Sequence, residues 1–171
     1  DYPDLQYELD RQKNKLPANI KVVEFYYPAG KYLSNPQAQQ DVVPLGHPDS
    51  MLRARDRLDA GCLVGLLADR SLAHDSTAEC MFLGAPARFP VGPWRMAAML
   101  RRPVFFMAGL YLGGNRYELH FEPLADFTHV ERGDREAAIA SAMQAYADRL
   151  GDFCRRAPYN WFNFYDFWQR P

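Results

Sequence analysis

Two charged side chains, Asp69 and Arg70, follow directly on the apolar run of residues 62–68. Such a run is typical of a strand buried on both faces of a sheet, and ligands of open α/β sheets bind beyond the carboxyl ends of the strands. A carboxylate and a guanidinium at that place can hold a phosphate or orient another side chain. The same two residues also fit a structural ion pair or the start of a loop, so both interpretations stay open.

A second candidate is the compact turn of residues 82–93, which leads into a helix that we expect to begin at Gly92 and Pro93 and to end near Arg101. Free backbone N–H groups and the dipole at a helix N-terminus attract anions. However, Pro93 has no amide hydrogen to donate, and an ordinary junction between a loop and a helix explains the same pattern.

The four histidines are candidates for a general base, and two of them have an acidic residue five positions on: His74 with Glu79, and His129 with Asp134. A His-x4-acid pair is the dyad of many acyltransferases, in which the histidine is the base and the acid orients it. Because 21 of the 171 residues are acidic, chance supplies such pairs, and both lie in polar loops after a strand. We therefore assign neither pair a catalytic role.

Cys80 could act as a nucleophile with His74 as its base, although a packed, inert thiol explains it better. Three cysteines without paired spacing predict a reducing compartment and no structural zinc. The sequence contains no G-x-S-x-G, P-loop or G-x-G-x-x-G motif, which disfavours an unrelated α/β hydrolase. The net charge of -1 gives no general attraction to nucleic acid, and no apolar run has the length of a membrane-spanning helix.

The order of strands and helices expected along the chain predicts one α/β domain over residues 1–171. It would have a mostly parallel sheet, an antiparallel edge hairpin and flanking helices. Strands are expected at residues 20–27, 41–45, 62–68, 104–112 and 116–121. Helices are expected at residues 51–60, 92–101 and 134–156. Ser50 and Asp134 are the expected N-caps, Gly61 the expected C′ residue, and Gly113 with Gly114 the hairpin turn.

The C-terminal tail, residues 158–168, holds seven aromatic side chains. They are expected either to pack in the core around the long helix or to form a surface for the membrane interface, where Trp and Tyr accumulate. Arg155, Arg156 and Arg170 are close enough in sequence to meet anionic lipid in the second case.

An ordered set of short motifs resembles the bacterial lysophospholipid and lipid A biosynthesis acyltransferase family over about residues 50–168. The motifs are Asp69-Arg70, Phe82-Leu83-Gly84, Ala87-x-Phe89-Pro90-x-Gly92-Pro93 and Arg102-Pro103-Val104. The aromatic phrase of residues 157–168 looks most like the acyltransferases of aryl-polyene and xanthomonadin-type pigment clusters, which are often fused to a glycosyltransferase.

The resemblance implies the fold of glycerol-3-phosphate acyltransferases and transfer of an acyl group from an acyl-carrier-protein or coenzyme A thioester to a lipid-like acceptor. No metal and no further cofactor are implied. The enzyme would make peripheral contact with lipid at the cytoplasmic face of the bacterial inner membrane. Asp69 and Arg70 would line the acceptor or thioester site, and Phe89, Pro90 and Gly92 would continue its wall.

The family's catalytic His-x4-Asp/Glu motif precedes the strand that corresponds to residues 20–27, and no histidine occurs before that strand here. Lys31 is the only candidate for the basic residue that usually follows it. We therefore expect the chain to be the C-terminal portion of an acyltransferase domain, inactive alone, with an open sheet that self-associates. The alternative is a non-catalytic module that binds a lipid or an acyl carrier.

Overall fold

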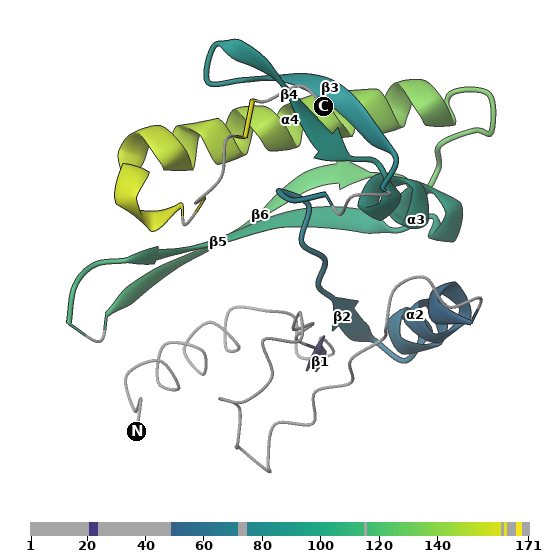
Figure 1. Ribbon diagram of the computed structural model, residues 1–171. Coiled ribbons are helices and arrows are strands. Elements are labelled where there is room, and N and C mark those ends of the chain that lie inside the picture. Colours follow the sequence, from purple (N-terminus) through teal and green to yellow (C-terminus); the bar gives the residue numbers. More distant parts are fainter. Residues whose placement is uncertain are drawn as a thin grey trace. The chain divides into compact units, whose positions relative to one another are not determined.

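The computed structural model describes residues 21–23, 49–71, 75–114, 116–161, 163 and 167–168. The chain forms two compact units, one made mainly of residues 68–171 and the other of residues 6–67. The expected strand at residues 41–45, and most of the one at residues 20–27, lie outside the described residues. Figure 1 shows the helices and strands with the labels used below.

The smaller unit contains a short parallel pair of strands, β1 (Lys21–Val23) and β2 (Cys62–Val64). The prediction of a strand over residues 62–68, buried on both faces, is wrong: β2 ends at Val64, and its three residues are only partly buried. Gly65 follows and weakens the strand, because glycine has no side chain to pack. An apolar run alone does not distinguish a strand from another buried segment.

Helix α2 (Ser50–Asp59) precedes β2 and begins one residue earlier than predicted. Asp49 is at its N-cap position, without a side-chain cap, so the prediction that Ser50 is the cap is wrong. Gly61 confirms the predicted C′ residue, since its φ of 81° lies in the left-handed region that favours glycine.

The larger unit consists of two antiparallel hairpins, two helices and a short 3-10 turn. In chain order they are β3 (Thr77–Phe82), β4 (Ala85–Pro90), α3 (Gly92–Leu100), β5 (Pro103–Tyr111), β6 (Tyr117–Asp126), α4 (Arg135–Arg156) and η1 (Pro158–Asn160). This mixture of helices and small sheets confirms the coarse α/β prediction, and the helices at α3 and α4 agree closely with the predicted ranges. Asp134 is at the N-cap position of α4 but makes no side-chain cap.

The mostly parallel sheet that the sequence predicted is not supported. The described residues form three two-stranded sheets, and only the short β1–β2 pair is parallel. The reason is the length of the connections, because a two-residue turn joins β3 to β4 and five residues join β5 to β6. Parallel neighbours need a crossover of a dozen or more residues, so such short turns allow only antiparallel pairing.

The β3–β4 hairpin was not predicted, because residues before Phe82 read as a polar loop. Its turn consists of Leu83 and Gly84, with φ of 52° and 91°, and two positive φ values are the mark of a tight hairpin turn. Leucine rarely adopts this conformation, which is why the sequence did not indicate a hairpin turn at these two residues. The expected compact turn over residues 82–93 is wrong, because Ala85–Pro90 form the strand β4. The β5–β6 hairpin, by contrast, confirms the prediction from Gly113 and Gly114, and its second strand runs on to Asp126.

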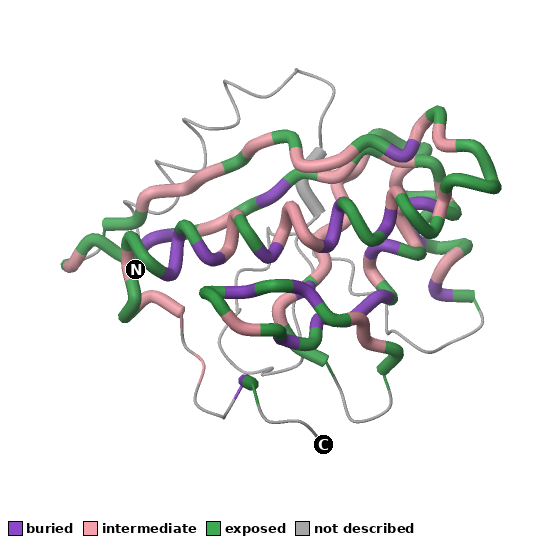
Figure 2. Tube along the Cα trace, turned by 90° about the horizontal axis from the view of Figure 1, so that it is seen from above, coloured by how far each residue is buried: buried purple, intermediate pink, exposed green. Residues whose placement is uncertain are grey.

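Helix α4 supplies one wall of the core and packs against β3, β6 and α3. Buried and exposed positions alternate along it in the pattern expected of a helix with one apolar face (Figure 2). The largest fully buried side chains of the unit are Phe82, Phe89, Phe127 and Met143. These aromatic and methionine side chains hold the hairpins and α4 together.

The aromatic tail contributes to this core. Trp161 and Phe167 lie 5.3 Å and 5.5 Å from the ring of Phe82, which confirms the core-packing interpretation for these two residues. Tyr159 instead is 91% exposed, and Phe162 and residues 164–166 lie outside the described residues. None of the helices that the structure describes is long and apolar enough to cross a membrane.

Candidate functional site

Asp69 and Arg70 lie on the segment between β2 and β3, directly after the buried core residue Ala68. The Asp69 Oδ2 and Arg70 Nε atoms are 3.5 Å apart, so the predicted ion pair exists. The Asp69 side chain is only 17% exposed, whereas half of the Arg70 side chain faces solvent. The pair therefore consists of a half-exposed guanidinium beside a sheltered carboxylate.

Tyr146 of α4 packs against the aromatic rings of Phe89 and Trp94. Its ring centroid lies 6.0 Å from Phe89 and 5.4 Å from Trp94. Burial, followed by the negative charge of Asp69, raises the pKa of the Tyr146 phenol far above its usual 10. The phenol therefore stays protonated and remains a hydrogen-bond donor.

Cys154 lies two turns further along α4, on the same face as Tyr146. Burial raises the pKa of its thiol to about 11, opposed by Arg155 and reinforced by Asp69. The charge of Asp69 thus contributes to the raised pKa of both Tyr146 and Cys154. The thiol is protonated at neutral pH and is not a nucleophile.

Phe89, Pro90 and Gly92 lie at the end of β4 and the start of α3. Phe89 is 0% exposed and packs edge-on against the rings of Phe82 and Phe167. Pro90 is also buried, while Gly92 is exposed. Phe89 and Pro90 thus support the site from behind, and the assignment of all three to a substrate wall stays a prediction.

Trp94 is a site residue that the sequence did not single out. Its side chain is buried, and its indole Nε1–H has no hydrogen-bond partner. Buried donors are almost always paired, so this one stands out beside Tyr146. The helical spacing of apolar residues predicted Tyr146 only as a member of the apolar face of the long helix. The one sign of a further role was its hydroxyl group among otherwise apolar side chains.

The two His-acid pairs do not form catalytic dyads in the described chain. His129 is exposed in the loop before α4, and its charge acts on Asp126, whose pKa is lowered mainly by hydrogen bonds from Thr128. No hydrogen bond or ion pair joins His129 to Asp134 within the residues described. His47 and His74 lie outside the described residues. Cys80 is buried, and burial raises the pKa of its thiol, as expected of a packed residue.

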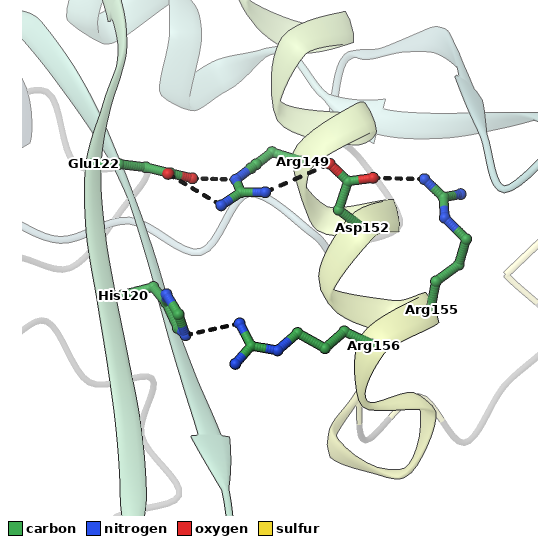
Figure 3. Close-up of polar contacts among 6 residues, drawn as sticks. All are labelled: His120, Glu122, Arg149, Asp152, Arg155 and Arg156. Carbon is green, nitrogen blue, oxygen red and sulfur yellow. Dashed lines mark hydrogen bonds and ion pairs between the residues drawn. The ribbon is translucent and has the colours of Figure 1, made fainter.

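A polar cluster joins β6 to α4 (Figure 3). Its members are Glu118, His120, Glu122, Arg149, Asp152, Arg155 and Arg156. Arg149 donates through two nitrogens to Glu122, and Arg156 Nη2 lies 2.9 Å from both carboxylate oxygens of Glu118. His120 Nε2 lies 2.9 Å from Glu118 Oε1 and 3.4 Å from Arg156 Nη1.

In this polar cluster three arginines face three carboxylates, so its charges balance when His120 is neutral. Each of these arginines is paired with a carboxylate of the cluster, so the three do not form a basic patch that would bind an anion. Its role is to hold the hairpin against the helix. Across the described ranges, no group of His, Cys, Asp and Glu side chains is arranged to hold a metal ion.

One family model matches the chain. The model of the bacterial lipid A biosynthesis acyltransferases matches residues 38–170, which include Asp69, Phe89, Trp94 and Tyr146. No curated protein matches the chain. Because the family model covers well over half of the sequence, the chain belongs to the bacterial lipid A biosynthesis acyltransferase family.

Proposed function

We propose that this chain forms part of an enzyme that transfers an acyl group from an acyl-carrier-protein or coenzyme A thioester to a hydroxyl or amine of a lipid-like acceptor. The observation that carries the proposal is the family match over residues 38–170. Within that range the charge of Asp69 contributes to the raised pKa of Tyr146 on α4, and the Phe89 ring packs against the Tyr146 ring.

The chemistry requires a nucleophile to attack the thioester carbonyl, a base to take its proton, and a thiolate to leave. Asp69, a sheltered carboxyl group 17% exposed, is suited to orient the acceptor through a hydrogen bond. The guanidinium of Arg70 is suited to the phosphate of a coenzyme A or phosphopantetheine arm, or of a lipid headgroup. The general base in this proposal is the family's His-x4-acid motif, which no described residue supplies.

The finer features of the proposal come from the resemblance of the aromatic phrase at residues 157–168. It assigns the acyltransferase to the aryl-polyene or xanthomonadin type, with action at the cytoplasmic face of the inner membrane. The acceptor is then a membrane lipid or a lipid-linked intermediate, and the enzyme touches the bilayer peripherally.

One observation favours a second candidate, a non-catalytic module that binds a lipid or an acyl carrier. Of the two histidines that the structure describes, His120 is engaged in the polar cluster and His129 acts on Asp126. Neither shows an interaction with Asp69 in the described part of the chain. A binding module would use Asp69 and Arg70 to hold its ligand and would perform no chemistry.

An acyl-transfer assay with long-chain acyl-coenzyme A and acyl-carrier protein separates the two candidates. It is run on this chain, on the complete gene product that contains it, and on Asp69→Asn, with Glu131→Gln as an exposed acidic control. The enzyme proposal predicts transfer by the complete product, lowered on the order of 10²-fold by Asp69→Asn and unchanged by Glu131→Gln. Binding of acyl-carrier protein without any transfer would support the module instead.

A further inference from the structure

The inner face of the β5–β6 hairpin packs on α4 through the buried side chains Phe106 and Leu110, which contact Phe153. On the same face, Glu118 and Glu122 pair with arginines of α4. The opposite face alternates with these residues and is exposed, with Met107 at 70% and Phe105 at 41%. An antiparallel sheet that packs one face on a core usually turns a polar face to water, whereas the outward face of this hairpin is apolar.

The outer face is continuous across both strands. Met107 lies opposite Phe121, and Tyr111 opposite Tyr117. The Phe105 and Phe121 rings stack at 4.9 Å. At Gly109, an added Cβ would lie 3.3 Å from Leu119 Cδ2, so the Leu119 side chain covers the gap that glycine leaves. The outer face of the hairpin is composed of Phe105, Met107, Gly109, Tyr111, Tyr117, Leu119, Phe121 and Pro123.

No charged residue lies among these eight positions, and the charges next to them are mainly basic. Arg116 is exposed beside the hairpin turn, and Arg101 is exposed just before β5. The acid at that end, Asp126, accepts hydrogen bonds from the backbone and hydroxyl of Thr128. An apolar surface with aromatic rings and arginine at both ends is complementary in charge to an anionic lipid surface.

We propose that the outer face of the β5–β6 hairpin binds the surface of an anionic membrane. This inference rests on the proposed function, in which the acceptor is a lipid, and it adds which surface of the chain contacts the membrane. Eight residues on two strands are far fewer than the 20–30 residues per side of a standard protein interface. They suit shallow contact with headgroups and the adjoining acyl chains, with Tyr111 and Tyr117 at headgroup depth.

The inference also moves the expected membrane surface away from the aromatic tail. Trp161 and Phe167 of the tail are packed against Phe82, so they contribute to the core. The aromatic residues available on the hairpin are Phe105, Tyr111, Tyr117 and Phe121, all exposed. Tyr159 is the tail residue that most exposes its ring, and it serves to test the tail separately.

The test is co-sedimentation of the purified chain with vesicles of phosphatidylglycerol and phosphatidylethanolamine, and with vesicles of phosphatidylcholine alone. The variants are Met107→Glu and Arg116→Glu. Met81→Glu is the matched control, because Met81 is 52% exposed on β3 in the same unit. The proposal predicts binding to the anionic vesicles that falls at least about ten-fold in both hairpin variants, is retained by Met81→Glu, and weakens with added salt.

Equal binding by Met107→Glu and the wild type would overturn the proposal, as would loss of binding only in Tyr159→Glu, which would assign the lipid surface to the tail. Absence of binding together with a dimer that Met107→Glu dissociates would show a second copy on this face. A large drop in melting temperature for Met107→Glu but not Met81→Glu would show that the face is buried within its own chain. Vesicle binding needs no acyl transfer, so an inactive chain that binds would leave this inference standing while removing the proposed reaction.

Discussion

At the residue scale, Tyr146 interacts with residues of both segments that the sequence indicated as candidate sites. Asp69 belongs to the segment after β2, and Phe89 belongs to the end of β4, yet both act on the same side chain of α4. Asp69 is a sheltered carboxyl group, and Phe89 is a fully buried ring. Phe89 therefore supports the packing around Tyr146, and the binding of a ligand by Asp69 stays a prediction.

Replacing Phe89 by alanine is expected to lower the free energy of unfolding by about 3–5 kcal/mol, because a fully buried ring leaves a cavity among Phe82, Phe167 and Tyr146. Phe105→Ala is the matched control on an exposed strand position and should cost less than about 1 kcal/mol. Urea denaturation of both variants measures the difference. Similar losses in the two variants would contradict the assignment of Phe89 to the core.

The Cys154 thiol makes the stability of the chain depend on alkaline pH. Its pKa is about 11 in the folded chain against an ordinary value of 9.0, so the folded state holds the proton more tightly. The stabilisation is complete below pH 9 and is lost as the pH rises through 11. Free energies of unfolding measured from pH 8 to pH 10.5 should fall with pH, and less steeply in Cys154→Ala, where Cys80 and Tyr146 still contribute.

The raised pKa of the Cys154 thiol should also slow its reaction with alkylating reagents. About one Cys154 side chain in a thousand is a thiolate at pH 8 with a pKa near 11. Iodoacetamide should therefore label Cys154 slowly in the folded chain and quickly in urea, as mass spectrometry of the peptides would show. Rapid labelling of the folded chain at pH 8 would contradict the burial described for this residue.

The site was partly predictable from the sequence at this scale. Asp69 and Arg70 were found because a change from apolar to charged residues is visible in any sequence. Trp94 and Tyr146 were missed because their importance depends on which helix face meets which hairpin. The buried indole N–H of Trp94 in particular follows only from packing that local patterns do not encode.

At the scale of elements, the polar cluster and the apolar core both hold α4 against the hairpins, and they meet at Phe153, over which the Arg149 guanidinium lies. The charged residues of β6 reach α4 through Arg149 and Arg156, while β3 reaches it through Gln144. The amide of Gln144 accepts a hydrogen bond from the Met81 backbone N–H and donates to its carbonyl, both at 2.9 Å. The Gln144 side chain thus pairs both backbone groups of Met81, so these two groups are not available to another strand.

The polar cluster makes stability depend on acidic pH. A hydrogen bond from Arg156 is the main cause that lowers the pKa of Glu118 below its usual 4.5, and Arg155 does the same for Asp152. A carboxylate with a lowered folded pKa stabilises the fold above its unfolded pKa, and this is lost as the pH falls through the folded value. Glu118→Gln should flatten the loss of stability below pH 4.5 relative to wild type, whereas the exposed control Glu131→Gln should not.

The hairpins show which elements sequence patterns predict and which they do not. Gly113 and Gly114 indicated the β5–β6 turn correctly, because glycine marks positive φ directly. Leu83 accepts a φ of 52° only because the strands on both sides pair, so the β3–β4 hairpin had no local signal. The error in predicting a parallel sheet has the same origin, since an apolar run carries no information on its partner strand.

At the scale of the whole molecule, family membership agrees with the mixed helices and small sheets of the two units. The single domain over residues 1–171 stays a prediction, as does self-association of the chain through an open sheet. Light scattering at high concentration tests the latter, and a monodisperse monomer would contradict it.

The proposed site is tested by the acyl-transfer rates of the complete gene product carrying Asp69→Asn, Tyr146→Phe or both substitutions, with acyl-carrier protein as donor. The proposed cooperation of Asp69 with Tyr146 predicts that each single variant transfers more slowly at an unchanged melting temperature. It also predicts that the double variant is little worse than Asp69→Asn alone, because the two side chains act as a unit. Wild-type rates in both single variants would contradict the assignment of acyl transfer to this face of α4.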